Sequence, residues 1–157
     1  MEDRQNCQCS CGKTRFNVRG HPMFRGFCHC TICQAYNDAP YADITLFRAK
    51  HVDMPRAGSV EYKTYRAPPA VQRGKCIACG RPAVEFIHIF PMPKLIIVPS
   101  ANILDPALLP KPALHIFYDS RVADVDDDLP KFQGYLSSQL AFGRQLVASL
   151  LRGESPA

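Results

Sequence analysis

The sequence predicts a mainly β fold that ends in a single helix. Short segments in which apolar and polar residues alternate, or in which β-branched and aromatic residues gather, recur along most of the 157 residues. Most of the 14 prolines fall between Lys50 and Ala113, and their spacing excludes long helices from that region. One stretch near the C-terminus instead places leucines near helical spacing.

The expected strands are short and follow one another along the chain. Alternation or aromatic and β-branched content predicts strands within residues 13–20, 42–48 and 59–67. Residues 83–90 and 94–100 are apolar enough for central strands, and residues 113–119 indicate one more.

The helix is expected over residues 134–152, where Gly153 can end it. Its apolar stripe comprises Leu136, Leu140, Leu146, Val147, Leu150 and Leu151. One such stripe needs one buried face, so the helix is interpreted as a lid on the sheet or as a homodimer contact. Residues 126–128, all aspartates, are interpreted as a solvated loop or as charges near the helix start rather than as a metal site.

Length and composition fit one domain over residues 1–157, with a core at about 5–133 followed by the helix. The net charge of +5 comes from scattered Lys and Arg, without the basic runs or aromatic-basic strands of nucleic-acid-binding proteins. The polar N-terminus is unlike a signal peptide, and no apolar run is long enough to span a bilayer. A soluble, cytoplasmic protein without nucleic-acid or membrane partners is therefore expected.

Eight cysteines in an intracellular chain indicate metal coordination, because cytosolic thiols are kept reduced. Two of the clusters, CSCG and CIACG, each end in a glycine that can turn backbone N–H groups back toward a sulfur. Pairing them predicts a closed structural zinc site that couples metal binding to folding. Its ligands would be Cys9, Cys11, Cys76 and Cys79.

The remaining cluster, CHCTIC, supplies Cys28, Cys30 and Cys33 without an obvious fourth ligand. Three protein ligands and one open position are typical of a reactive zinc. The alternative is a closed second site, completed by His29, His21 or Cys7. The side chain of His29 would point away from its neighbours in an extended segment, which weighs against it.

Cys7 is left over when the first cluster is closed by Cys9 and Cys11. Three interpretations stay open for it: a bystander, a substitute ligand for the three-thiolate site, or a thiol that oxidises against a neighbour.

The cysteine clusters and the residues around them resemble the glutathione-dependent formaldehyde-activating enzyme (GFA) family. The matching motifs are CSCGKTRF, FCHCTICQ, YRAPPAVQRGKCIACGRP and, more loosely, LDPALLPKPALHIFYDSR. The resemblance implies an Mss4-like β-sandwich or β-tent fold with two zinc ions per chain, the second not necessarily at full occupancy. It also implies the same division into a structural set (Cys9, Cys11, Cys76, Cys79) and a catalytic set (Cys28, Cys30, Cys33).

The reaction implied by the resemblance is formation or cleavage of the carbon–sulfur bond of S-hydroxymethylglutathione, so the expected partner is a glutathione-like thiol or its adduct. Arg73 and Lys75 could meet glutathione carboxylates, but both are interpreted as surface charges, and His115 as a structural histidine. The chain departs from the family pattern at Gln34, where a basic residue is common, and in having no Trp. The substrate is therefore left open.

Two other functions stay open on the sequence. A non-enzymatic zinc scaffold would have only structural metal, and its second site would be closed or empty. A redox or metal-handling cluster would use exposed thiols at Cys28, Cys30 and Cys33.

Overall fold

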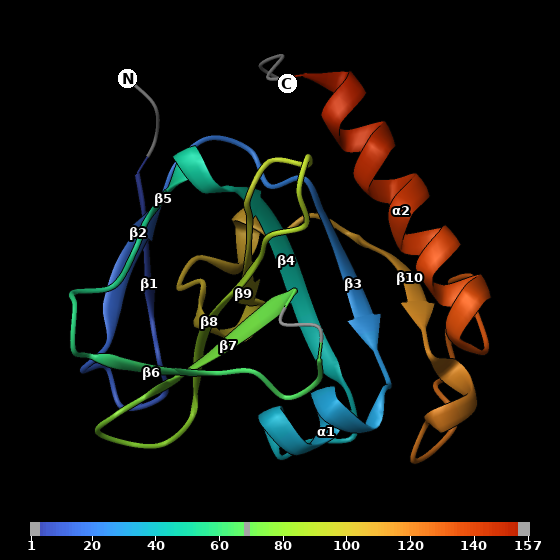
Figure 1. Cartoon of the computed structure of the whole chain (residues 1–157), viewed down its shortest axis with the longest axis horizontal. Coiled ribbons are helices and arrows are strands. Elements are labelled where there is room, and N and C mark those ends of the chain that lie inside the picture. The colour runs from blue at the N-terminus through green and yellow to red at the C-terminus, as the bar shows by residue number, and fades with distance from the viewer. Residues whose placement is uncertain (1–3, 68–69, 154–157) are drawn as a thin grey trace.

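The computed structural model describes residues 4–67 and 70–153, which form two β-sheets and two α-helices (Figure 1). The smaller sheet contains, in spatial order, β1 (Gln5–Gln8), β2 (Arg15–Val18) and β5 (Val52–Asp53). The larger sheet contains, in spatial order, β10 (Pro112–Ile116), β3 (Phe24–Cys28), β4 (Ala42–Arg48), β9 (Leu95–Pro99), β8 (Pro82–Ile87), β7 (Val71–Cys76) and β6 (Val60–Lys63). The helices are α1 (Thr31–Asn37) and α2 (Tyr135–Arg152). The predicted mainly β fold with a C-terminal helix is confirmed.

The central strands of the larger sheet are buried on both faces, as their continuous apolar sequences require. In β9, Leu95 and Ile97 belong to one core cluster, while Ile96 and Val98 belong to the other. Successive side chains of a strand point to opposite faces, so this division places a separate core on each side of the sheet. Each fully buried aliphatic side chain of this kind contributes about 1.5–3 kcal/mol.

One core joins the two sheets, and the other joins the larger sheet to the helices. Phe16 and Val18 of β2 pack with Ile96 and Val98 in the first core. In the second core, Leu146 of α2 packs in the same cluster as residues of β3, β4 and β9. The larger sheet is therefore the middle layer of the molecule.

Helix α2 lies along the β10–β3 end of the larger sheet (Figure 1). Its buried residues are Ser138, Ala141, Leu146 and Ser149, while several leucines of the predicted stripe face outward. The exposed ones include Leu136, Leu140 and Leu151. Ser138 accepts a hydrogen bond from the Phe117 N–H, and Ser149 donates to the Met23 carbonyl, so small polar residues seat the helix. The helix was predicted correctly, but much of its apolar stripe is not the face that packs on the sheet.

Strand β10 runs parallel to β3, whereas the other pairs in this sheet are antiparallel. The register sets His115 opposite Phe27 and Ile116 opposite Cys28. This pairing places the end of β10 beside the end of β3, where the CHCTIC cluster begins. Within the described residues, no helix is long and apolar enough to cross a bilayer.

Candidate metal centres

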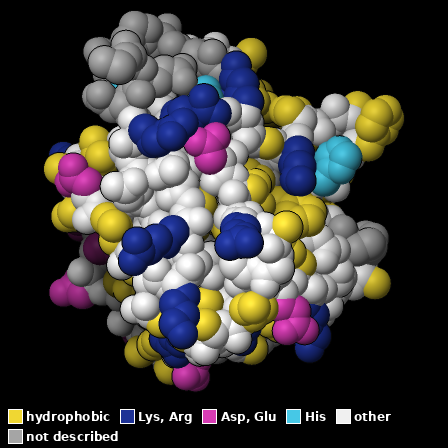
Figure 2. All heavy atoms as spheres, turned by 90° about the vertical axis from the view of Figure 1, so that its left-hand side faces the viewer, with side chains coloured by type: hydrophobic (Ala, Val, Ile, Leu, Met, Phe, Trp, Pro, Cys, Tyr) yellow, Lys and Arg dark blue, Asp and Glu magenta, His cyan; other side chains and the backbone are white. Residues whose placement is uncertain are grey.

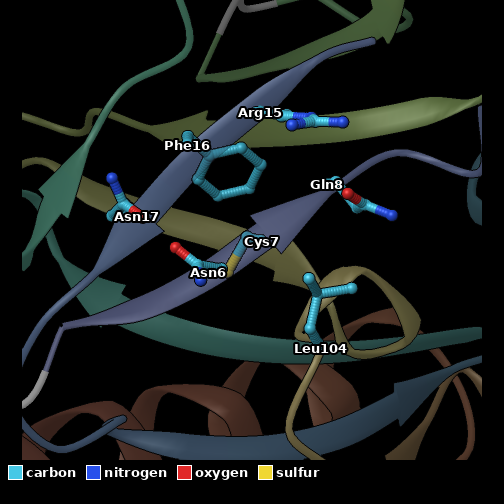
Figure 3. A pocket seen from close by; sticks show the side chains of 7 residues that line it. All are labelled: Asn6, Cys7, Gln8, Arg15, Phe16, Asn17 and Leu104. Atoms are coloured by element: carbon cyan, nitrogen blue, oxygen red, sulfur yellow. The ribbon is translucent and has the colours of Figure 1, made fainter. Parts of the chain in front are cut away.

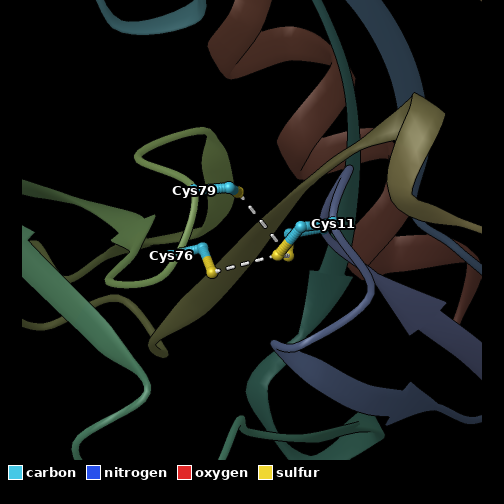
Figure 4. A group of neighbouring side chains, drawn as sticks. Cys11, Cys76 and Cys79 are labelled. Atoms are coloured by element: carbon cyan, nitrogen blue, oxygen red, sulfur yellow. Dashed lines mark hydrogen bonds between the residues drawn. The ribbon is translucent and has the colours of Figure 1, made fainter.

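The first cysteine cluster lies where the two sheets meet. Cys9 and Cys11 come from the loop between β1 and β2, Cys76 is the last residue of β7, and Cys79 lies in the turn between β7 and β8. Their four Sγ atoms lie within 4.8 Å of one another. Figure 4 shows Cys76 and Cys79 pointing toward Cys11, with Cys11 Sγ 3.8 Å from Cys76 Sγ. The structure therefore brings together the four residues that the sequence paired.

Two glycine turns set this geometry. Gly12 and Gly80 both have positive φ, at 75° and 69°, a region that L residues with a Cβ rarely adopt. The Gly12 N–H donates to the Cys9 carbonyl at 2.9 Å, and the Gly80 N–H donates to the Cys76 carbonyl at 2.8 Å. Each turn folds its short cysteine segment back on itself, so that both sulfurs of a segment face the other segment.

Hydrogen bonding favours thiolates at two residues of the first cluster, Cys9 and Cys76. At Cys11 a hydrogen bond from the Lys13 backbone acts in the same direction, but hydrogen bonds to the neighbouring thiols raise the Cys11 pKa to about 11. Burial opposes ionisation of Cys76, but hydrogen bonds from the Thr14 hydroxyl and from the N–H groups of Cys79 and Ala78 outweigh it and lower the Cys76 pKa to about 6. The pKa of Cys9 is also lowered, against the effect of burial, by hydrogen bonds that include one from the backbone of Thr14. Thiolates are the ligands that zinc prefers, so the donor set suits this ion.

The second cluster is built at the junction of β3 and α1. Cys28 is the last residue of β3, Cys30 is the N-cap of α1, and Cys33 lies in the first turn of that helix. The Cys33 N–H donates to Cys30 Sγ at 3.3 Å, so the helix start holds the Cys30 sulfur over the turn that carries Cys33. The three Sγ atoms lie within 4.8 Å, and in the described parts of the chain no fourth His, Cys, Asp or Glu belongs to this group.

The three sulfurs of the second cluster shift one another's pKa values in opposite directions. Interaction with the Cys28 and Cys33 thiols lowers the pKa of Cys30 far below its usual 9.0, although burial opposes the change. Interaction with Cys30 raises the pKa of Cys28, and interaction with Cys28 and Cys30 raises the pKa of Cys33. A cation at this position would relieve the repulsion that otherwise prevents all three thiols from ionising.

Arg73 of β7 adds a positive charge beside the second cluster. The charge of Arg73 acts on Cys30 and lowers its pKa further. The Arg73 side chain is only 12% exposed, and its Nε lies 3.5 Å from Oε1 of the buried Glu85. The interpretation of Arg73 as a surface charge is therefore wrong: the sheet buries it between Glu85 and the thiolates. Lys75 is half-buried, with its Nζ 5.8 Å from the centre of the Tyr36 ring.

The residue between two of these cysteines, His29, is fully buried and faces away from the sulfur group. Its Nε2 lies 2.8 Å from Nδ1 of His115, whose Nε2 lies 2.8 Å from Oδ2 of Asp127. Burial lowers the pKa of His29 to about 4, and charge on His115 and Arg121 acts in the same direction. His115 is a hydrogen-bonded structural histidine, as predicted.

The aspartate-rich loop is not uniformly solvated. Asp126 and Asp128 are exposed, as expected of a solvated loop. Asp127 instead turns inward to His115 and to Lys131, whose Nζ lies 2.6 Å from Asp127 Oδ1. Burial opposes its ionisation, but hydrogen bonds from Lys131 and His115 lower the Asp127 pKa to about 2. The solvated-loop interpretation is therefore wrong for this one residue.

Cys7 belongs to neither sulfur group in the described residues. It lies in β1 opposite Phe16 of β2 and packs in the core between the sheets. Burial raises its pKa to about 12. Figure 3 shows it beside Phe16 at a pocket of about 350 Å³ that is lined by residues of β1 and β2 and by Leu104. This placement favours the bystander interpretation.

A comparison with protein families relates the two clusters to known proteins. The sequence model of the glutathione-dependent formaldehyde-activating enzyme (GFA) family matches residues 4–120, about three quarters of the chain. The chain belongs to this family. The GFA match covers both cysteine clusters and ends before the aspartate loop and α2. A comparison with curated proteins found no match.

The departure from the GFA pattern at Gln34 has a structural role that sequence reasoning missed. The Gln34 side chain donates to the carbonyl of His29 at 2.7 Å and to that of Ser120 at 2.8 Å. Both bonds use the two protons of one amide nitrogen, Nε2. The amide ties the CHCTIC segment to the turn after β10.

Basic side chains do not merge into one surface on the face shown in Figure 2, which is the left side of Figure 1. There, Lys and Arg stand apart from one another or beside acidic groups. This distribution agrees with the scattered basic residues of the sequence.

The homodimer contact suggested for α2 stays a prediction.

Proposed function

We propose that the chain is a zinc-dependent carbon–sulfur lyase that forms or cleaves a thiol–aldehyde adduct such as S-hydroxymethylglutathione. The observation that carries this proposal is the three-membered sulfur group of Cys28, Cys30 and Cys33. Three protein ligands leave one position of a tetrahedral metal for a substrate, whereas the four-membered group is complete without one. Membership of the GFA family supports glutathione and formaldehyde as the reactants.

Each cysteine cluster has a separate task in this proposal. Cys9, Cys11, Cys76 and Cys79 hold a structural zinc, and Cys28, Cys30 and Cys33 hold the reactive one. Zinc in an open three-thiolate site supplies Lewis-acid chemistry, because it lowers the pKa of a thiol that completes the coordination.

The reaction needs no oxidant or reductant. In the forward direction, the thiol sulfur forms a bond to the carbonyl carbon, and the thiol proton is transferred to the carbonyl oxygen. In the reverse direction the carbon–sulfur bond breaks, the sulfur leaves with the bonding electron pair and takes up the proton of the hydroxyl group, and the carbon–oxygen double bond forms again. Arg73 carries a permanent positive charge beside the thiolates, and this charge favours the anionic form of sulfur at the site.

The test compares wild type with Cys30→Ser, and uses Cys7→Ala as a control that removes a buried thiol outside both groups. Zinc per chain is measured first, followed by the rate of S-hydroxymethylglutathione formation from glutathione and formaldehyde. Wild type and Cys7→Ala are expected to hold two zinc ions and to exceed the spontaneous rate. Cys30→Ser should hold one zinc ion, stay folded and match the spontaneous rate.

Either measurement can contradict the proposal. If zinc-loaded wild type leaves the spontaneous rate unchanged, this aldehyde and this thiol are not its substrates. If Cys30→Ser still holds two zinc ions and retains full activity, the three-cysteine group is not the reactive site.

A further inference from the structure

A line of four hydrogen-bonded side chains leads from the loop after β10 into the CHCTIC segment. It runs from Lys131 to Asp127 at 2.6 Å, then to His115 at 2.8 Å and to His29 at 2.8 Å. His29 and His115 are at most 1% exposed. The proposed reaction does not use any of these four residues, and the last of them lies between two cysteines of the second cluster.

The carboxylate at the outer end fixes which atom donates in its own bond to His115. The ionised Asp127 can only accept, so His115 donates from Nε2. Nδ1 of His115 lies 2.8 Å from Nε2 of His29, so these two ring nitrogens share one hydrogen bond. The remaining ring nitrogen, Nδ1 of His29, is buried without a hydrogen-bond partner. His29 is thus held at one ring atom, and the orientation of that atom depends on Asp127 through His115.

The backbone of His29 is held by the same part of the fold. Its N–H donates to the Ile116 carbonyl at 3.0 Å, and its carbonyl accepts from Gln34, which also donates to Ser120. Main chain and side chain of His29 therefore both connect to residues 115–120, directly or through Gln34. The peptide that joins Cys28 to Cys30 is therefore held by hydrogen bonds of both the main chain and the side chain of His29.

We propose that Asp127 and His115 are positioning residues for the three-cysteine site: they hold His29 and, through it, the spacing of Cys28 and Cys30. This inference rests on the proposed function, because it assumes that the second cluster binds metal. The positioning residues do not touch the metal or the substrate. They act by keeping the two sulfurs converged before metal binding, so that binding does not have to order this peptide.

The expected size of the effect follows from comparable outer-shell partners. Loss of such a partner commonly weakens metal binding 10–100-fold, because the ligand must then be oriented at the moment of binding. Here the influence passes through a neighbouring residue rather than through a ligand, so we expect a loss of about tenfold, at the lower end of that range.

Cobalt(II) provides a spectroscopic test, because its thiolate charge-transfer and ligand-field bands report geometry at each site. Full-length metal-free protein is titrated with cobalt under anaerobic reducing conditions, and Cys30→Ser identifies the spectrum of the four-cysteine site alone. Asp127→Ala removes the carboxylate from a side chain that is 28% exposed. Asp128→Ala is the matched control, because Asp128 is an exposed neighbour in the same loop.

We expect Asp127→Ala to weaken binding of the second cobalt equivalent about tenfold and to change its ligand-field bands. The first equivalent should bind as in wild type. The urea unfolding midpoint should fall, because the contacts of Asp127 with Lys131 and His115 are lost, but it should fall by the same amount in metal-free protein. Asp127→Asn keeps an oxygen that can accept from His115, so it should recover much of the lost affinity. Asp128→Ala should match wild type in every measurement.

Three results would overturn the inference. If Asp127→Ala binds the second equivalent with wild-type affinity and spectrum, the line of hydrogen bonds does not position the site. If it weakens both equivalents alike, its effect is on the fold as a whole. If wild type binds only one equivalent, the proposed function fails as well, and this outcome separates the two proposals.

Discussion

Arg73 and Glu85 show how single residues shape the site from inside the sheet. Both side chains are largely buried, at 12% and 4% exposure, and Nε of Arg73 lies 3.5 Å from the carboxylate. Burial raises the pKa of Glu85 to about 7, although the charge of Arg73 acts in the opposite direction. The stability of this pair therefore depends on both partners, because either charge alone would be left in an apolar environment.

Removing only the arginine should cost more stability than removing both charges. Arg73→Met leaves Glu85 buried without its partner, and at pH 9, where the carboxyl of wild type is ionised, we expect the free energy of unfolding to fall by roughly 3 kcal/mol. The double variant Arg73→Met/Glu85→Gln should be more stable than Arg73→Met alone, because it removes the unpaired carboxylate. Urea unfolding of the four members of this double-mutant cycle measures the coupling. Strictly additive losses would show that the two side chains do not stabilise each other.

At the scale of elements, the sequence predicted the strands whose composition is uniform and missed those that contain exceptions. The strands β4 and β9 are rich in β-branched and apolar residues and were predicted. The strand β3 contains Arg25 and Gly26, and β7 contains Arg73 and Gly74, so neither has a clear strand pattern. In both, pairing with neighbouring strands overrides local propensity.

The candidate site, too, was predicted in one part and missed in another. Metal-ligand spacing is local, so the two cysteine groups could be assembled from CSCG, CIACG and CHCTIC. The contacts of His29 with His115, and of His115 with Asp127, depend on the parallel pairing of β10 with β3. Nothing local in the sequence indicates that pairing. The short helix α1 was also missed, because its start is set by Cys30 as N-cap rather than by an apolar period.

Gly74 is the point where strand β7 has no space for a side chain. A Cβ there would lie 2.5 Å from Val60 Cγ1, 2.7 Å from the Val84 carbonyl oxygen and 2.8 Å from Tyr62 Cε1. Because one of these atoms is backbone, Gly74→Ala should lower the free energy of unfolding by roughly 1–3 kcal/mol. Gly143→Ala is the matched control: it has open space within α2 and should raise stability by about 0.5–1 kcal/mol. Urea unfolding that moves both variants in the same direction would contradict this account.

For the molecule as a whole, the two cysteine clusters differ in the length of the chain segment that a metal bound to each would close into a loop. The first cluster joins the smaller sheet to the larger one through pairs that are 65 and 70 residues apart in sequence. The second lies within a single segment at the β3–α1 junction. A cross-link that closes a long loop removes more entropy from the unfolded chain than one that closes a short loop. The chain-entropy relation gives about 4 kcal/mol for a loop of about 70 residues and about 2 kcal/mol for one of about six.

This difference predicts which zinc ion maintains the fold. Cys9→Ser should lose the metal of the first cluster and with it the link between the sheets, so that guanidinium unfolding occurs at a markedly lower midpoint. Cys30→Ser should lower the midpoint less, because the core between the sheets and the packing of α2 stay in place. We expect the two variants to differ by about 2 kcal/mol in the free energy of unfolding, measured with zinc present in excess. A zinc-replete Cys9→Ser protein as stable as wild type would show that Cys9 is not a ligand. If Cys30→Ser were the less stable variant, the structural and reactive roles of the two clusters would have to be exchanged.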